Sequence, residues 1–80
     1  MPPAGPPGPA TNLVWAEAPT GAVDGVNNTF FLAHTPVSGV KLFVNGVGQR
    51  PSLDYTLSGS QITFSVSPKM GETIVANYNY

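Results

Sequence analysis

The side chain best suited to acid–base catalysis in this 80-residue chain is its single histidine, His34. A histidine acts as a general base when a nucleophile and an orienting carboxylate lie beside it. Serines and aspartates are present, but any small protein would supply as many. His34 follows Phe30 and Leu32 at alternate positions and precedes Thr35 and Pro36. We therefore predict a histidine that ends a strand and hydrogen-bonds a turn, and we predict no catalytic residue and no enzymatic activity.

One loop is rich in the oxygen ligands that calcium prefers. It covers residues 24–29, Asp-Gly-Val-Asn-Asn-Thr. An EF-hand loop needs more carboxylates and a bidentate glutamate at its end. Asn and Asp also hydrogen-bond their own backbone in turns, which explains the same composition without a metal. The chain has no cysteine, so disulfides and thiolate metal sites are excluded. We predict no metal site and no cofactor.

Charged residues are too sparse for several classes of partner. They make up 9% of the chain, against roughly 25% in an ordinary soluble domain. The formal net charge is −1, and the three basic residues, Lys41, Arg50 and Lys69, fall in separate segments. Such a surface cannot follow a phosphate backbone, so nucleic acid is not an expected partner. A segment that spans a bilayer needs about 20 apolar residues, and the sequence has no such segment. The first six residues also lack the basic start of a secretory signal.

The aromatic side chains are the remaining candidates for binding. A core this small cannot hold all of them, and Phe31 and Phe43 are next to predicted core leucines, so they face the opposite way. Exposed aromatic surface on a small domain usually marks a protein interface. It could alternatively be a platform on which a sugar ring stacks, although interface burial is the commoner use. The aromatic interface candidates are Trp15, Phe31, Phe43, Tyr78 and Tyr80.

Five of the nine prolines fall within the first nine residues, which predicts an extended arm over residues 1–11. Proline fixes φ and donates no backbone hydrogen bond, so we expect polyproline II rather than helix or central strand. Residues 5–10 also form two collagen-type triplets, which could follow a threefold axis if the domain trimerises. The arm is either a frayed tail or a stiff segment that docks on a neighbouring subunit at low entropic cost. Docking would add Pro2, Pro3, Pro6, Pro7 and Pro9 to the interface.

From residue 12 to residue 80, short apolar runs of period two alternate with turn residues. This pattern is typical of an all-β domain. Asn45 and Gly46 lie between two such runs and predict a tight hairpin. In a second predicted hairpin, Ile62, Phe64 and Val66 share one face. The candidate strands are residues 13–16, 29–34, 40–44, 47–50, 54–57, 61–66 and 73–80.

Six to seven short strands behind an N-terminal arm predict a compact antiparallel sandwich or a partly open barrel over residues 12–80. A domain of 8.3 kDa buries only roughly 60% of its unfolded surface. Without disulfides or a metal, oligomerisation or docking on a larger assembly is the expected support. So few charges also leave the sheet edges open to pairing. The predicted core comprises Phe30, Leu32, Leu42, Val44, Tyr55, Leu57, Ile62, Phe64, Ile74 and Ala76.

Several segments resemble a small β-domain that recurs in virion proteins of tailed bacteriophages, often fused to tail-fibre or baseplate chains. The most specific are residues 42–46 (Leu-Phe-Val-Asn-Gly), residues 54–59 (Asp-Tyr-Thr-Leu-Ser-Gly) and residues 78–80 (Tyr-Asn-Tyr). The resemblance covers residues 13–80. The Gly-Pro-Pro triplets are similar to those that precede trimeric phage fibre domains. The resemblance implies a structural or adhesive role and transfers no catalytic residues.

A chain that begins at Met1 with no long fibre attached looks more like an accessory protein than like a receptor-binding tip. The expected function is a structural protein of the virion, assembled in the bacterial host cytoplasm, that decorates the capsid or tail. Its β-domain and arm would dock on capsid or tail subunits and on its own copies, as a homo-oligomer for which a trimer is one candidate. The alternative is a receptor- or carbohydrate-binding module of a tail fibre or baseplate, in which Trp15 or Tyr78 lines an open groove.

Overall fold

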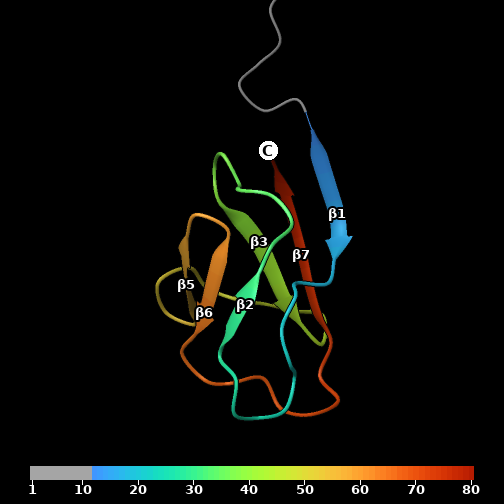
Figure 1. Ribbon diagram of the computed structural model, residues 1–80, viewed down its shortest axis with the longest axis vertical. Coiled ribbons are helices and arrows are strands. Elements are labelled where there is room, and N and C mark those ends of the chain that lie inside the picture. The colour runs from blue at the N-terminus through green and yellow to red at the C-terminus, as the bar shows by residue number, and fades with distance from the viewer. Residues whose placement is uncertain (1–11) are drawn as a thin grey trace, which may run out of the picture.

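The computed structural model describes residues 12–80, and these residues form seven short strands and no helix (Figure 1). The all-β prediction is confirmed. The predicted arm over residues 1–11, with its five prolines, lies outside the described residues. Within the described part of the chain, no helix is long and apolar enough to cross a membrane. The strands are β1 (Leu13–Glu17), β2 (Thr29–Phe31), β3 (Val40–Val44), β4 (Val47–Gly48), β5 (Tyr55–Ser58), β6 (Gln61–Phe64) and β7 (Ile74–Asn79).

The strands form two antiparallel sheets, which pack face to face as the predicted sandwich (Figure 1). One sheet has the strand order β1-β7-β3-β4, and the other has the order β2-β6-β5. Both predicted hairpins are present. Val44 pairs with Val47 across the β3–β4 turn, and Ser58 pairs with Gln61 across the β5–β6 turn. The central strand β7 joins β1 to β3, so residues from both ends of the chain share one sheet.

Alternation along the strands sends one set of side chains between the sheets, because successive residues of a strand face opposite ways. Two predicted core residues are only partly buried: Val44 lies beside the hairpin turn, and Leu57 lies in the edge strand β5. Val40 and Tyr78 are buried although the predicted core omitted them. The buried core is Phe30, Leu32, Val40, Leu42, Tyr55, Ile62, Phe64, Ile74, Ala76 and Tyr78.

Three strands end at least two residues earlier than predicted. β2 stops at Phe31, β4 stops at Gly48, and β6 stops at Phe64. Val66, which the alternation placed on the core face, is 76% exposed. The chain turns after β6 because the Ser65 hydroxyl donates to the Leu53 carbonyl, 2.7 Å away, and this contact holds the segment against the loop before β5. The alternation of polar and apolar residues in the sequence therefore continues two residues beyond the end of β6.

The β3–β4 turn has the backbone that its sequence requires. Asn45 and Gly46 have φ angles of 51° and 80°, and a two-residue hairpin turn of this type needs positive φ at both positions. The Asn45 side chain adds a second function, because its Oδ1 accepts the Thr73 N–H at 2.8 Å. The Asn45 N–H donates to the Thr73 carbonyl, also at 2.8 Å. These contacts tie the hairpin to the start of β7 and fix the end of the four-stranded sheet.

Candidate functional site

A bulge in β1 decides which of its side chains reach each face of the four-stranded sheet. Two residues of β1, Trp15 and Ala16, oppose the single residue Asn77 of β7. Ala16 has a φ of 57°, the left-handed conformation found in one type of bulge, and its N–H donates to Asn77 Oδ1 at 2.6 Å. Because of the extra residue, Trp15 lies on the outer face while Glu17 points inward, although a regular strand would place both on one face.

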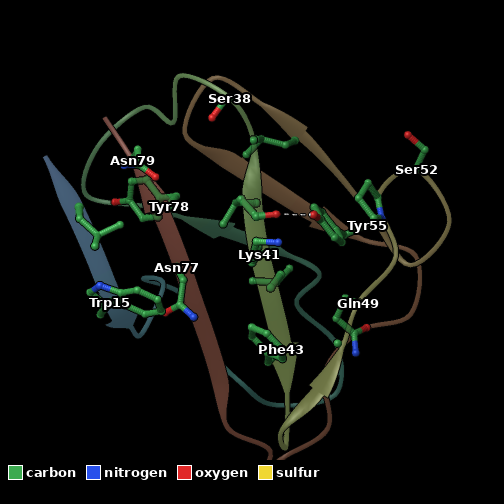
Figure 2. A pocket seen from close by; sticks show the side chains of 17 residues that line it. Trp15, Ser38, Lys41, Phe43, Gln49, Ser52, Tyr55, Asn77, Tyr78 and Asn79 are labelled. Atoms are coloured by element: carbon green, nitrogen blue, oxygen red, sulfur yellow. Dashed lines mark hydrogen bonds between the residues drawn. The ribbon is translucent and has the colours of Figure 1, made fainter. Parts of the chain in front are cut away.

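The outer face of this sheet gathers aromatic, amide and ammonium groups (Figure 2). Trp15 is 68% exposed and lies next to Asn77, whose amide nitrogen points away from β1. Lys41 pairs with Asn77 across β3 and β7. These side chains line a shallow groove of about 910 Å³, which we call the Trp15 groove. Its outward-facing side chains are Leu13, Trp15, Lys41, Phe43, Asn77 and Asn79.

The far side of the groove is built around Phe43 and Gly48, which pair across the β3–β4 hairpin. A Cβ placed on Gly48 would lie 3.7 Å from the Phe43 ring, so the ring covers the bare backbone of the glycine. Since β4 has only two residues, it leaves the other half of β3 unpaired on that side. There the Tyr55 hydroxyl donates to the Val40 carbonyl at 2.9 Å (Figure 2). Burial raises the pKa of Tyr55, which keeps this donor protonated.

The three-stranded sheet presents a different outer face. Its outward-facing side chains are Thr29, Phe31, Thr56, Ser58, Gln61 and Thr63, of which only Phe31 is apolar. Phe31 is 47% exposed, and one exposed ring among polar neighbours is ordinary for a protein surface. The sequence grouped Phe31 with the other aromatic candidates, but the structure places it on the opposite side of the sandwich from Trp15 and Phe43.

Tyr78 belongs to the core, and the prediction that it is an exposed aromatic is wrong. Only 3% of its surface is exposed, because the β7 alternation turns it toward the opposite sheet. Its hydroxyl donates to Glu17 Oε1 at 2.5 Å and accepts the His34 N–H at 3.2 Å. The pKa of Tyr78 is raised to about 12. Burial is the largest cause, and the hydrogen bond to Glu17 raises the pKa further. Glu17 Oε2 also accepts the Ala33 N–H at 2.7 Å, so one carboxylate fastens the loop after β2 to β1 and β7.

Tyr80 and His34 form a stacked pair beside this loop. Their ring centroids are 3.6 Å apart and the planes differ by 2°. His34 is exposed and Tyr80 is half-buried, so the interface candidate Tyr80 already has a partner inside the chain. His34 makes its hydrogen bond through the backbone N–H, to the hydroxyl of Tyr78. The histidine is thus part of the packing at this end of the sandwich.

Two further polar clusters support the backbone. Asp24 Oδ1 accepts the N–H groups of Asn27 and Val26 at 2.8 and 2.9 Å, which confirms the predicted Asx turn and lowers the pKa of Asp24. Arg50 donates to Asp54, with a shortest side-chain distance of 3.2 Å, and lowers the pKa of that carboxyl group. Among residues 12–80, no three His, Cys, Asp or Glu side chains come together in a way that could hold a metal ion.

The Trp15 groove is therefore the candidate functional site. Trp15 and Phe43 line it from the outer face, together with Leu13 and the polar side chains of β3 and β7. The buried Tyr55 and Tyr78, the latter a third aromatic candidate, also contribute to its lining. The sequence missed Leu13 and the amides, because nothing in the chain marks β1 as the edge strand beside β7. No protein-family model, curated protein or solved structure matches this chain.

Proposed function

We propose that this chain is a non-enzymatic structural protein of a tailed-phage virion that docks on neighbouring virion proteins through the Trp15 groove. The observation that carries the proposal is the exposed Trp15 beside Leu13 and Phe43 on one face of the sandwich. Its partners are capsid or tail subunits and further copies of the chain, in a homo-oligomer for which a trimer is one candidate. Its place of action is the virion, which is assembled in the host cytoplasm.

The chemistry of the groove supports docking on a protein surface. Trp15 and Leu13 are 68% and 54% exposed, so their apolar surface is in contact with water until a partner covers it. Burial of apolar surface is worth roughly 25 cal/mol per Å². An exposed tryptophan bordered by polar side chains also has the composition of an interface hot spot. Lys41, Asn77 and Asn79 supply that polar surround.

The engagement of the acidic side chains supports a structural rather than a catalytic role. Glu17 holds Tyr78 and the loop after β2, and Asp24 holds its own turn. Asp54 is paired with Arg50. Glu72 accepts the Lys69 N–H at 2.6 Å. Each carboxylate thus stabilises a nearby backbone segment, and the groove itself is lined by amides and one ammonium group.

Quantitative mass spectrometry of purified particles tests this proposal. The particles are those produced by the genome that encodes the chain, and the measurement is the copy number of the chain relative to the major capsid protein. A ratio near one, or a fixed fraction of it, places the protein on the shell. A few copies per particle place it on the tail. Absence of the chain from particles that are otherwise complete contradicts the proposal.

A second candidate function is carbohydrate or receptor binding by the same groove. It is favoured by one observation, the position of the exposed Trp15 ring next to the amide of Asn77 (Figure 2). An aromatic ring can cover the apolar face of a sugar while amides and an ammonium group bind its hydroxyls. Trp15 is the chain's single tryptophan, so saturable quenching of its fluorescence by glycans supports this function. Unchanged Trp15 fluorescence across a broad panel of glycans contradicts carbohydrate binding by the groove.

A further inference from the structure

We propose that the Trp15 groove of one copy binds the proline-rich arm, residues 2–9, of a second copy. This inference rests on the proposed docking function and names one occupant of the groove. The occupant follows from three properties of the chain: the spacing of the arm's prolines, the chemistry of the groove, and the direction in which the chain leaves β1.

The prolines of the arm are spaced for recognition along one face. Pro3, Pro6 and Pro9 recur every third residue. Polyproline II has three residues per turn and rises about 3.1 Å per residue, so in this conformation the three rings would lie on one face, about 9.3 Å apart. Pro2 and Pro7 would then lie on other faces. Aromatic-lined grooves commonly recognise proline-rich segments of this kind.

The groove matches such a face in spacing. Trp15 on β1 and Phe43 on β3 are separated laterally by the single strand β7. Adjacent strands are about 4.8 Å apart, so these two rings start from positions about 9.6 Å apart across the sheet. That separation is close to one turn of polyproline II. Residues 2–9 would extend over about 25 Å, which is enough to cross all four strands of the sheet.

The hydrogen-bonding groups are also complementary. Prolines have no N–H, so the arm offers mainly carbonyl acceptors, and residues 2–11 carry no charged side chain. The groove offers donors: the Lys41 ammonium, the Trp15 indole and the Asn77 amide. Asn77 uses its oxygen to accept the Ala16 N–H, which leaves its NH₂ group facing away from β1 (Figure 2).

The direction of β1 points to a second copy as the source of the arm. Asn12 extends the ladder with Tyr80: its N–H donates to the Tyr80 carbonyl at 3.2 Å, and the Tyr80 N–H donates back at 3.0 Å. Traced backwards from Trp15, the chain therefore runs through Leu13 and Asn12 away from the middle of the groove. An arm stiffened by prolines would have to reverse at once to reach its own Trp15. The arm of another copy can enter without that reversal.

Two copies can exchange arms reciprocally about a twofold axis, which gives a closed dimer. When each arm instead passes in one direction to the next copy, the contact is heterologous and three copies form the smallest closed ring. The inference therefore connects the arm, the groove and the proposed homo-oligomer through one contact.

The test uses the full chain, its single tryptophan and its molar mass. We expect the mass to rise with concentration from 8.3 kDa toward a multiple of that value. The Trp15 emission should shift to the blue over the same range, as arms cover the ring. The triple substitution Pro3→Ser, Pro6→Ser and Pro9→Ser should weaken this association about 30-fold, the loss typical of an interface hot spot.

The matched control is the double substitution Pro2→Ser and Pro7→Ser, which changes the same arm off the proposed contact face and should keep most of the association. Both variants leave every residue of the buried core unchanged. Equal association of the triple variant and the parent overturns the inference. So does a chain that stays at 8.3 kDa with a water-exposed Trp15 at its highest soluble concentration.

If the emission is blue-shifted at every concentration while the chain keeps its monomer mass, the arm covers its own groove, and this result also overturns the inference.

The results that overturn the inference differ from those that contradict the proposed function. If the triple variant enters particles as well as the parent does, the docking function stands and the arm does not occupy the groove. If the arm and groove associate in solution while particles lack the chain, the virion role fails and the contact between copies remains.

Discussion

At the residue scale, Phe30 is fully buried between the sheets, and its ring meets the Phe64 ring edge to face with centroids 5.5 Å apart. Gly21, in the segment before β2, lies directly against this ring. A Cβ built on Gly21 would be 2.4 Å from the ring of Phe30, closer than real contacts allow. The packing of the core residue Phe30 therefore depends on the absence of a side chain at Gly21, which itself lies outside the core.

We expect the substitution Gly21→Ala to destabilise the fold by about 1–3 kcal/mol, the usual cost of overfilling a core. The Phe30 ring must move, and it is held by Phe64 on its other side. Gly48→Ala is the matched control, since its Cβ would meet the Phe43 ring at an ordinary 3.7 Å. Urea unfolding followed by circular dichroism measures both. Equal stability of the two variants would show that the Phe30 contact does not limit the packing.

Tyr78 makes the stability of the sandwich sensitive to alkaline pH. Its pKa is about 12 in the folded chain, against about 10 in an unfolded one. Above pH 10 the unfolded state loses a proton that the folded state retains, so stability falls as the pH rises from 10 to 12. Below pH 10 this contribution is fully present. Burial also raises the pKa of Tyr55, which acts in the same direction.

Unfolding free energies measured from pH 8 to pH 12 should therefore decline above pH 10. The substitution Tyr78→Phe keeps the ring in the core and removes the titrating group, so its decline over the same range should be shallower. The variant should also be less stable at pH 8 by about 1–3 kcal/mol, because Glu17 loses the hydroxyl partner. Parallel pH curves for parent and variant would contradict this account of Tyr78.

At the scale of the element, the bulge in β1 lets Trp15 face the groove while Glu17, two residues later, faces the core. If β1 were a regular strand that kept Ala16 in its ladder, Glu17 would face outward with Trp15 and could not reach the hydroxyl of Tyr78. A left-handed residue other than glycine costs roughly 1–2 kcal/mol. Here the two hydrogen bonds made by Glu17 and the one made by the Ala16 N–H offset that cost.

Replacement of Ala16 by glycine should stabilise the chain by about 0.5–1 kcal/mol, because glycine adopts the observed φ of 57° without steric cost. Ala18→Gly provides the comparison, since Ala18 has no positive φ and glycine there should be neutral or destabilising. Thermal unfolding of both variants measures the difference. A loss of stability in the Ala16 variant equal to that of the Ala18 variant would contradict the strained bulge.

The same bulge marks the limit of what the sequence could predict. Both hairpins were predictable because their turns have local requirements, such as positive φ at Asn45 and Gly46. Along β7, alternation predicted the burial of Ile74 and Ala76 but not that of Tyr78. The bulge carries no such mark, since its left-handed residue is an alanine, and so the inward position of Glu17 could not be foreseen. At Val66 the sequence predicted burial that the structure does not have. The alternation of apolar and polar residues continues to Val66, although the strand ends before Ser65, whose hydroxyl bonds the Leu53 carbonyl.

At the scale of the whole molecule, the two outer faces of the sandwich differ in what they can bind. The four-stranded sheet carries Trp15, Leu13 and Phe43 in one groove, whereas the three-stranded sheet carries Phe31 alone among polar residues. Docking should therefore use one side of the molecule. The sequence predicted that aromatic surface remains outside the core, but the division between the two faces depends on sheet order, which no local pattern encodes.

Trp15→Ala should lower incorporation into particles about 30-fold while the fold stays intact, since the ring lies outside the core and dominates the groove. Its stability should change by no more than about 0.5 kcal/mol, as for other surface substitutions. Phe31→Ala is the matched control and should be incorporated like the parent. Quantitative mass spectrometry of particles made with each variant measures this. Equal incorporation of all three chains would place the docking surface elsewhere.

The most direct test of the central claim is site-specific photo-crosslinking inside the assembled particle. A photoreactive phenylalanine derivative replaces Trp15 in one chain and Phe31 in another, and mass spectrometry identifies the proteins joined to each. We predict crosslinks from position 15 to a capsid or tail subunit or to a second copy of the chain, and few from position 31. Particles that contain both chains but show crosslinks only from position 31, or from neither position, would contradict the assignment of the Trp15 groove as the docking site.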